Sequence, residues 1–127
     1  MRAATSRSSR SPPPCRWRSP PPSSSREEGV SAEVLDLRCL VPLDASAVLA
    51  SVARTSRLVT VEENPYQGGW GATVAALVAD EGFELLDAPI RRVAAACVPL
   101  PFADALEDQV LPTVGSVVDV VRRLAAY

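Results

Sequence analysis

The first 28 residues of this 127-residue chain constrain its fold most, because they cannot build a hydrophobic core. They hold six of the twelve prolines, eight serines and six arginines, and apart from a few alanines their only apolar residues are Met1, Cys15 and Trp17. Burial of so few apolar groups cannot offset the conformational entropy that is lost on folding. The sequence therefore predicts a disordered Pro/Ser/Arg-rich tail over residues 1–28 and a folded domain over residues 29–127.

Charge changes at the same boundary and leaves several roles open for the tail. The tail has six arginines against two glutamates, whereas the remaining residues have seven arginines against thirteen acids. The proline runs 12–14 and 20–22 could bind a groove lined by aromatic residues on a partner protein. The Arg-Trp-Arg stretch 16–18 could bind nucleic acid by stacking the Trp17 ring on a base. The high Arg and Ser content is also typical of organelle transit peptides. A segment with no selected function is the interpretation that we favour over these three.

Residues 29–127 alternate between patterns typical of strands and of helices. Strands are expected over 32–37, 57–62 and 90–94, from their short apolar or β-branched runs. Helices are expected after Asp44, after the loop 63–69 up to Gly82, and over 114–125, with Asp44 and Thr113 as N-caps. The proline-containing stretch 97–112 is expected to be an irregular connection. This alternation predicts an α/β fold around a parallel sheet that is short of one element.

The residues that are absent exclude most familiar catalytic sites. Without His or Lys, the chain cannot form a Ser-His-Asp or Cys-His nucleophile system, a phosphate-loop lysine or an imidazole metal site. The three cysteines, at 15, 39 and 97, are odd in number and widely spaced, which predicts free thiols in a reducing cytoplasm. No apolar run is long enough to span a membrane.

Three groups of residues remain as chemical candidates. Glu62 and Glu63 end a predicted strand, but neighbouring residues point to opposite faces, so solvated or interface carboxylates are favoured over an acid/base pair. The glycines of the GGWG run 68–71 could bind an anion at a helix N-terminus, although a tight turn with close backbone packing is favoured. The acids at 104, 107 and 108 are expected to be solvated rather than to bind a metal.

Four segments resemble one enzyme family in order and spacing. They are EVLDLRCLVPLD (33–44), LVTVEENPYQGGWGA (58–72), FELLDAPIRRV (83–93) and VPLPFADALEDQVLP (98–112). Together they resemble the C-terminal, transketolase C-terminal-like domain of the beta subunit of thiamine-diphosphate-dependent 2-oxo acid dehydrogenases, the first component of the pyruvate and branched-chain complexes. This resemblance implies a three-layer α/β/α fold. One departure is Cys97, which stands where the family usually has Asp.

The resemblance also implies partners and a cofactor. In the family, alpha and beta subunits form a heterotetramer, and thiamine diphosphate with Mg²⁺ lies between the alpha subunit and the N-terminal domain of beta. The C-terminal domain contributes to subunit interfaces and to docking on the acyltransferase core. We therefore expect no catalytic, cofactor-binding or metal-binding residue in this chain, and neither membrane nor nucleic acid as a partner. The interface candidates are Glu62, Glu63, Gly68, Gly69, Gly71, Pro99, Pro101, Phe102, Leu106 and Glu107.

The family pattern further implies that this domain is truncated. A first strand and helix normally precede residue 30, and the tail occupies their place, so the chain is expected to be a fragment that is not catalytic alone. The implied sheet puts the missing strand between those at 32–37 and 58–62, where its loss would leave two strand edges unpaired and the chain marginally stable or dependent on a partner. The alternatives are a stand-alone interaction module, a non-functional gene remnant and a nucleic-acid binder with a basic tail.

Overall fold

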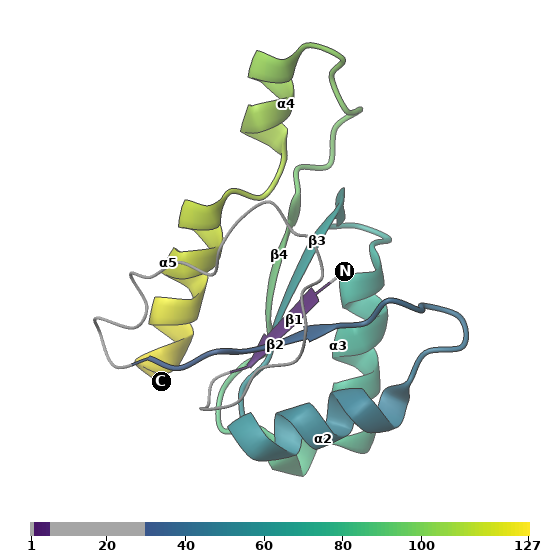
Figure 1. Ribbon diagram of the computed structural model, residues 1–127, viewed down its shortest axis with the longest axis vertical. Helices are drawn as coiled ribbons and strands as arrows, with labels where there is room; N and C mark the ends of the chain where they lie inside the picture. The colour runs from purple at the N-terminus through teal and green to yellow at the C-terminus, as the bar shows by residue number, and fades with distance from the viewer. Residues whose placement is uncertain (1, 6–29) are drawn as a thin grey trace.

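The computed structural model describes residues 2–5 and 30–127, which form three layers around one mixed sheet (Figure 1). Helices α2 and α3 cover one face of the sheet and α5 covers the other, while α4 projects beyond the layers. The bounds of the elements are β1 Arg2–Thr5, β2 Glu33–Asp36, α2 Ala45–Thr55, β3 Val59–Pro65, α3 Trp70–Glu81, η1 Phe83–Leu85, β4 Arg91–Ala95, α4 Asp104–Val110 and α5 Val114–Ala125. The predicted α/β/α architecture is confirmed.

The sheet has the order β2-β1-β3-β4. Strands β3 and β4 are parallel, with Val61 opposite Val93 and Pro65 opposite Ala95. Strand β1 is antiparallel to both of its neighbours, pairing Arg2–Thr5 with β2 and Arg2–Ala4 with β3. It follows that β2, β3 and β4 all run in one direction and that β1 alone runs against them.

Residues 2–5 differ from the prediction of a tail without regular structure, because they form β1. They lie between β2 and β3, at the place where a missing strand was expected. The physical reason is that the facing edges of β2 and β3 present backbone N–H and C=O groups that need partners, and a strand can satisfy them almost regardless of its sequence. The proline runs and the Arg-Trp-Arg stretch lie outside the described residues.

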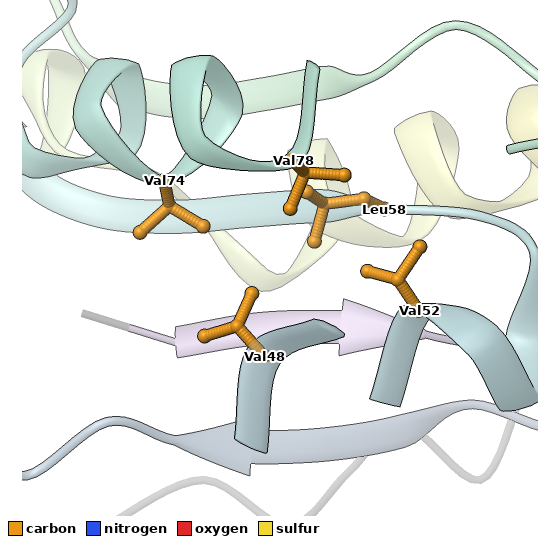
Figure 2. Close-up of a cluster of buried hydrophobic side chains, with 5 residues drawn as sticks. All are labelled: Val48, Val52, Leu58, Val74 and Val78. Atoms are coloured by element: carbon orange, nitrogen blue, oxygen red, sulfur yellow. The ribbon is translucent and has the colours of Figure 1, made fainter. Parts of the chain in front are cut away.

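Apolar side chains form a separate core on each face of the sheet. Between α2, α3 and the start of β3, the buried cluster consists of Val48, Val52, Leu58, Val74 and Val78 (Figure 2). On the opposite face, α5 packs on β3 and β4 through the buried residues Val59, Ala88, Val93 and Leu124. The strands need apolar residues on both faces because helices cover both, as the sequence predicted.

The helix ends follow the predicted capping residues. Asp44 caps α2, since its carboxylate accepts hydrogen bonds from the Ala47 N–H and the Ser46 hydroxyl. Thr113 caps α5 in a reciprocal capping box with Ser116. In contrast, the predicted irregular connection 97–112 contains a short helix, α4, which has no buried residue. The spacing of Leu106 and Val110 is helical but very short, and the prolines at 99, 101 and 112 on both sides of it favoured an irregular segment.

Glu33 joins β2 to α2. Its carboxylate accepts hydrogen bonds from the Ser51 hydroxyl and from the Arg54 guanidinium. The hydrogen bond from Arg54 holds the pKa of Glu33 below its ordinary value of 4.5, and the hydrogen bonds from Ser46 and Ala47 lower the pKa of Asp44 in the same way. Both carboxylates therefore favour the folded state only while they are charged.

We expect the free energy of unfolding to fall as the pH is lowered from about 4.5 to below the lowered pKa of Glu33. In this pH range the unfolded chain binds a proton at Glu33 more tightly than the folded chain does. The variant Glu33→Gln should be less stable than the wild type at pH 7 and approach it at low pH, where protonated Glu33 is also neutral. Urea unfolding at pH 7, 5, 4 and 3 measures this difference, with the exposed Glu84→Gln as control. A difference between wild type and Glu33→Gln that is constant with pH would contradict it.

Two further findings concern the cysteines and the lengths of the helices. Cys39 and Cys97 are exposed free thiols, whereas Cys15 lies outside the described residues. In the ranges 2–5 and 30–127, no helix is both long and apolar enough to cross a bilayer.

Candidate functional site

The carboxyl ends of the parallel strands β3 and β4 meet at one edge of the sheet and bring the two predicted interface segments together. Pro65 lies opposite Ala95, and the Tyr66 N–H donates a hydrogen bond of 3.1 Å to the Ala95 carbonyl. The loop from residue 66 to 69 and the segment from 96 to 110 therefore start side by side. We call these two stretches the carboxyl-edge segments.

Glu62 is buried beneath the first carboxyl-edge segment. Its residue exposure is 4%, and its Oε1 accepts a hydrogen bond of 2.9 Å from the Gly71 N–H and one of 3.0 Å from Arg92 Nη2. The Arg92 side chain is 12% exposed, so both charges of this ion pair are largely removed from water. Glu62 is therefore not the solvated carboxylate that the sequence allowed, because Arg92 and the start of α3 hold it inside the chain.

Glu62 also replaces the missing N-cap side chain of α3. Gly69 occupies the N-cap position and has no side chain to accept a hydrogen bond, so the carboxylate on β3 accepts one from the second residue of the helix. A carboxylate is favourable there because the exposed N–H groups give a helix N-terminus a partial positive charge. The anion at this helix N-terminus is thus a side chain of the protein itself.

The glycines of this loop allow Glu62 to approach. A Cβ atom on Gly71 would lie 2.3 Å from Glu62 Oε1 and 2.7 Å from Thr60 Oγ1, and one on Gly69 would lie 2.5 Å from Glu62 Oε2. The close backbone packing that the sequence favoured for these residues is confirmed. Gly68 has a different role, because its φ of 75° places it in the left-handed region of a turn.

Arg92 links the ion pair to the first carboxyl-edge segment. Its Nη2 donates a second hydrogen bond, 2.8 Å long, to the Tyr66 carbonyl, and its guanidinium carbon lies 4.2 Å from the centre of the Tyr66 ring. This cation–π contact and the hydrogen bond fix the backbone just after β3. Sequence reasoning did not select Arg92 or Tyr66, because β4 begins with two adjacent arginines and strand alternation shows only that their side chains point to opposite faces.

The described side chains of this cluster are satisfied only in part. Three of their buried polar atoms have no hydrogen-bond partner, and they are Thr60 Oγ1, Glu62 Oε2 and Arg92 Nε. Glu63, the neighbour of Glu62, points the other way and is exposed, as strand alternation predicted. The pair therefore serves as one structural and one surface carboxylate, with no geometry for joint acid/base chemistry.

The second carboxyl-edge segment carries exposed apolar side chains. Phe102 is fully exposed, and Val98, Leu100 and Leu106 are each about half exposed. Pro99 is also exposed, whereas Pro101 and Glu107 are half-buried. Figure 1 shows α4 extending from the layered body. The C-terminal end of α4 stays close to β4, because the Ala96 N–H donates a hydrogen bond to the Val110 carbonyl. Apolar side chains gathered on one protruding segment are typical of an interaction surface.

The resemblance implies thiamine diphosphate with Mg²⁺ as the cofactor of the parent family. In the ranges that the structure describes, no three or more His, Cys, Asp or Glu side chains are grouped so that they could hold a metal ion. The one buried carboxylate at the carboxyl edge, Glu62, is already engaged by Gly71 and Arg92.

Residues 23–117 match the model of one domain family, the transketolase C-terminal domain. The α/β/α fold described above is consistent with this match. This chain belongs to that family. It is 50% identical over 97 residues to the mitochondrial pyruvate dehydrogenase E1 component subunit beta-1 of Arabidopsis thaliana, which covers 76% of this chain and 27% of the relative.

Bacterial proteins match over a similar range. The acetoin:2,6-dichlorophenolindophenol oxidoreductase subunit beta of Bacillus subtilis is 48% identical over 98 residues, covering 77% of this chain and 29% of the relative. The pyruvate dehydrogenase E1 component subunit beta of Rickettsia felis is 42% identical over 102 residues, covering 80% and 31%. The chain thus spans less than a third of the length of these curated relatives, and the resemblance found in its sequence is confirmed.

Proposed function

We propose that this chain is the C-terminal part of a 2-oxo acid dehydrogenase beta subunit and that it supplies subunit-interface surface rather than catalytic residues. Its relatives include beta subunits of the pyruvate dehydrogenase E1 component. The observation that carries the interface role is the second carboxyl-edge segment, where Phe102 is fully exposed and α4 buries no residue within the chain. In this proposal the partners are an alpha subunit, a second beta subunit and the acyltransferase core.

The buried and the exposed residues of the carboxyl edge have different roles in this proposal. The Glu62–Arg92 pair fixes the backbone from which the first segment leaves β3, and β4 leads directly into the second. A rigid base for exposed apolar side chains lowers the entropy cost of association, because fewer groups must be ordered on binding. The cofactor of the parent family would be held outside this chain.

We expect Phe102→Asp to weaken binding of an alpha subunit by about 30-fold or more, since a central aromatic anchor contributes at least about 2 kcal/mol. The measurement is light scattering and calorimetric titration of the chain with the purified alpha subunit of a pyruvate dehydrogenase E1 component. The matched control is Phe83→Asp, because Phe83 is 72% exposed but lies in η1, away from the carboxyl edge.

Equal losses for the two phenylalanine variants would contradict the assignment of the surface, and the absence of any complex with the wild-type chain would overturn the interface role itself. Circular dichroism of both variants separates a binding defect from unfolding. Since both side chains are exposed, we expect both variants to retain the wild-type spectrum.

A further inference from the structure

Strand β1 joins β2 to the rest of the sheet although it lies far from the other strands in the sequence. It is the strand that separates β2 from β3, and in the described sheet β2 is hydrogen-bonded to β1 alone. Four residues of β1 pair with β2 and three pair with β3. We call the space between the edges of β2 and β3 the strand slot. Whatever occupies the strand slot determines whether β2 is part of the sheet.

The connection between β1 and β2 is unusual for antiparallel neighbours. Such strands are commonly joined by a hairpin of about two to five residues, which ties each strand to its neighbour. Here 27 residues, 6–32, separate Thr5 from Glu33. The entropy of loop closure disfavours β1 in its own slot more than a hairpin would, because this cost rises with loop length.

The same 27 residues give β1 a long reach. A chain of this length spans at most about 90 Å when fully extended, which is several times the diameter of a small domain. The segment 2–5 can therefore reach the strand slot of a neighbouring molecule without any change within residues 33–127. Backbone pairing with β2 and β3 would be the same in both cases, because the slot does not distinguish which copy supplies the strand.

We propose that two copies of this chain exchange β1, each inserting residues 2–5 between β2 and β3 of the other. The exchange is reciprocal, so it closes as a twofold dimer and leaves no slot empty. Exchange competes with insertion of β1 into the slot of its own molecule, so it becomes substantial only as the protein concentration approaches the effective concentration of a tethered strand, which is about 1 mM for short linkers. At micromolar concentration each copy keeps its own strand.

Cysteine pairs placed across the slot test this proposal. Ala4 and Val34 are partners in the register of β1 with β2, and Val34 is 53% exposed. In a full-length background with Cys15, Cys39 and Cys97 changed to Ser, one preparation carries Ala4→Cys and the other, with a distinguishable tag, carries Val34→Cys. The two are mixed at about 1 mM and at about 10 µM, oxidised, and separated on a non-reducing gel.

We expect a disulfide-linked heterodimer at the high concentration and at least a tenfold smaller fraction at the low one. A single chain carrying both Ala4→Cys and Val34→Cys should instead form an internal disulfide at 10 µM, which shows that the chain folds with β1 in register. The collision control pairs Ala4→Cys with Val41→Cys, because Val41 is 77% exposed but is not a partner of Ala4.

An internal disulfide without a heterodimer at 1 mM would overturn the exchange. Equal linkage to Val34→Cys and Val41→Cys would do the same, since it would indicate random collision. Failure to form the internal disulfide would show that residues 2–5 do not occupy the slot, and the proposal would then lose its basis.

Discussion

The variant Gly71→Ala should lower the free energy of unfolding by about 2–4 kcal/mol, although it adds a single methyl group at a position within a helix. The new Cβ would lie 2.3 Å from Glu62 Oε1 and 2.7 Å from Thr60 Oγ1, both of which belong to buried side chains. To make room, the carboxylate must move away from the Gly71 N–H that it caps. The substitution therefore combines overpacking with loss of a buried hydrogen bond.

The same change at Gly115 is the matched control. Gly115 also lies in the first turn of a helix, α5, but its added Cβ would meet only Thr113 Oγ1, at 3.8 Å. Because alanine is the better helix former, Gly115→Ala should leave stability unchanged or raise it by up to about 1 kcal/mol. Urea unfolding of both variants measures the difference. Similar stabilities for the two variants would show that Gly71 is not required for close packing.

The variant Glu62→Gln should cost about 3–5 kcal/mol, the largest effect that we expect from an isosteric change. Glutamine keeps the shape and can still accept the hydrogen bond from Gly71, but it removes the negative charge beside Arg92. The Arg92 guanidinium, whose side chain is 12% exposed, would then be a buried cation without a counter-charge. Its desolvation would no longer be offset, and thermal or urea unfolding would report the loss.

Two variants distinguish this charge effect from a general loss of stability caused by any substitution at the end of β3. Glu63→Gln changes the exposed neighbour and should stay within about 0.5 kcal/mol of the wild type. The double variant Glu62→Gln/Arg92→Met should be more stable than Glu62→Gln alone, because it removes the stranded charge together with its partner. Additive losses in the double variant would mean that the two residues act independently.

These two sites connect stability with the proposed interface. The ion pair, the glycine N–H and the Tyr66 carbonyl fix the chain where it leaves β3, and the exposed segment with Phe102 follows the adjacent strand. A loss of packing at Glu62 would therefore loosen the base of the carboxyl-edge segments. The buried cluster around Glu62 and Arg92 holds the backbone in position, whereas the contact surface that we propose consists of exposed residues.

Local signals predicted most of the secondary structure. The caps at Asp44 and Thr113, the apolar faces of α2 and α5, and the apolar runs of β2, β3 and β4 are each encoded within a few neighbouring residues. Helix α4 and strand β1, which the sequence did not reveal, carry weaker local signals. Helix α4 buries no side chain, and β1 is a four-residue segment within a polar, proline-rich region.

The sequence by itself determined the family, the alternation of strands and helices, and the exclusion of His- and Lys-based chemistry. Only the tertiary structure decided that Glu62 is paired with Arg92, 30 residues away, and that residues 2–5 fill the gap between β2 and β3. The physical reason is the same for both. A buried charge and an open strand edge each require a partner, but any suitable partner will serve, so its identity is settled by which residues the fold brings within hydrogen-bonding distance.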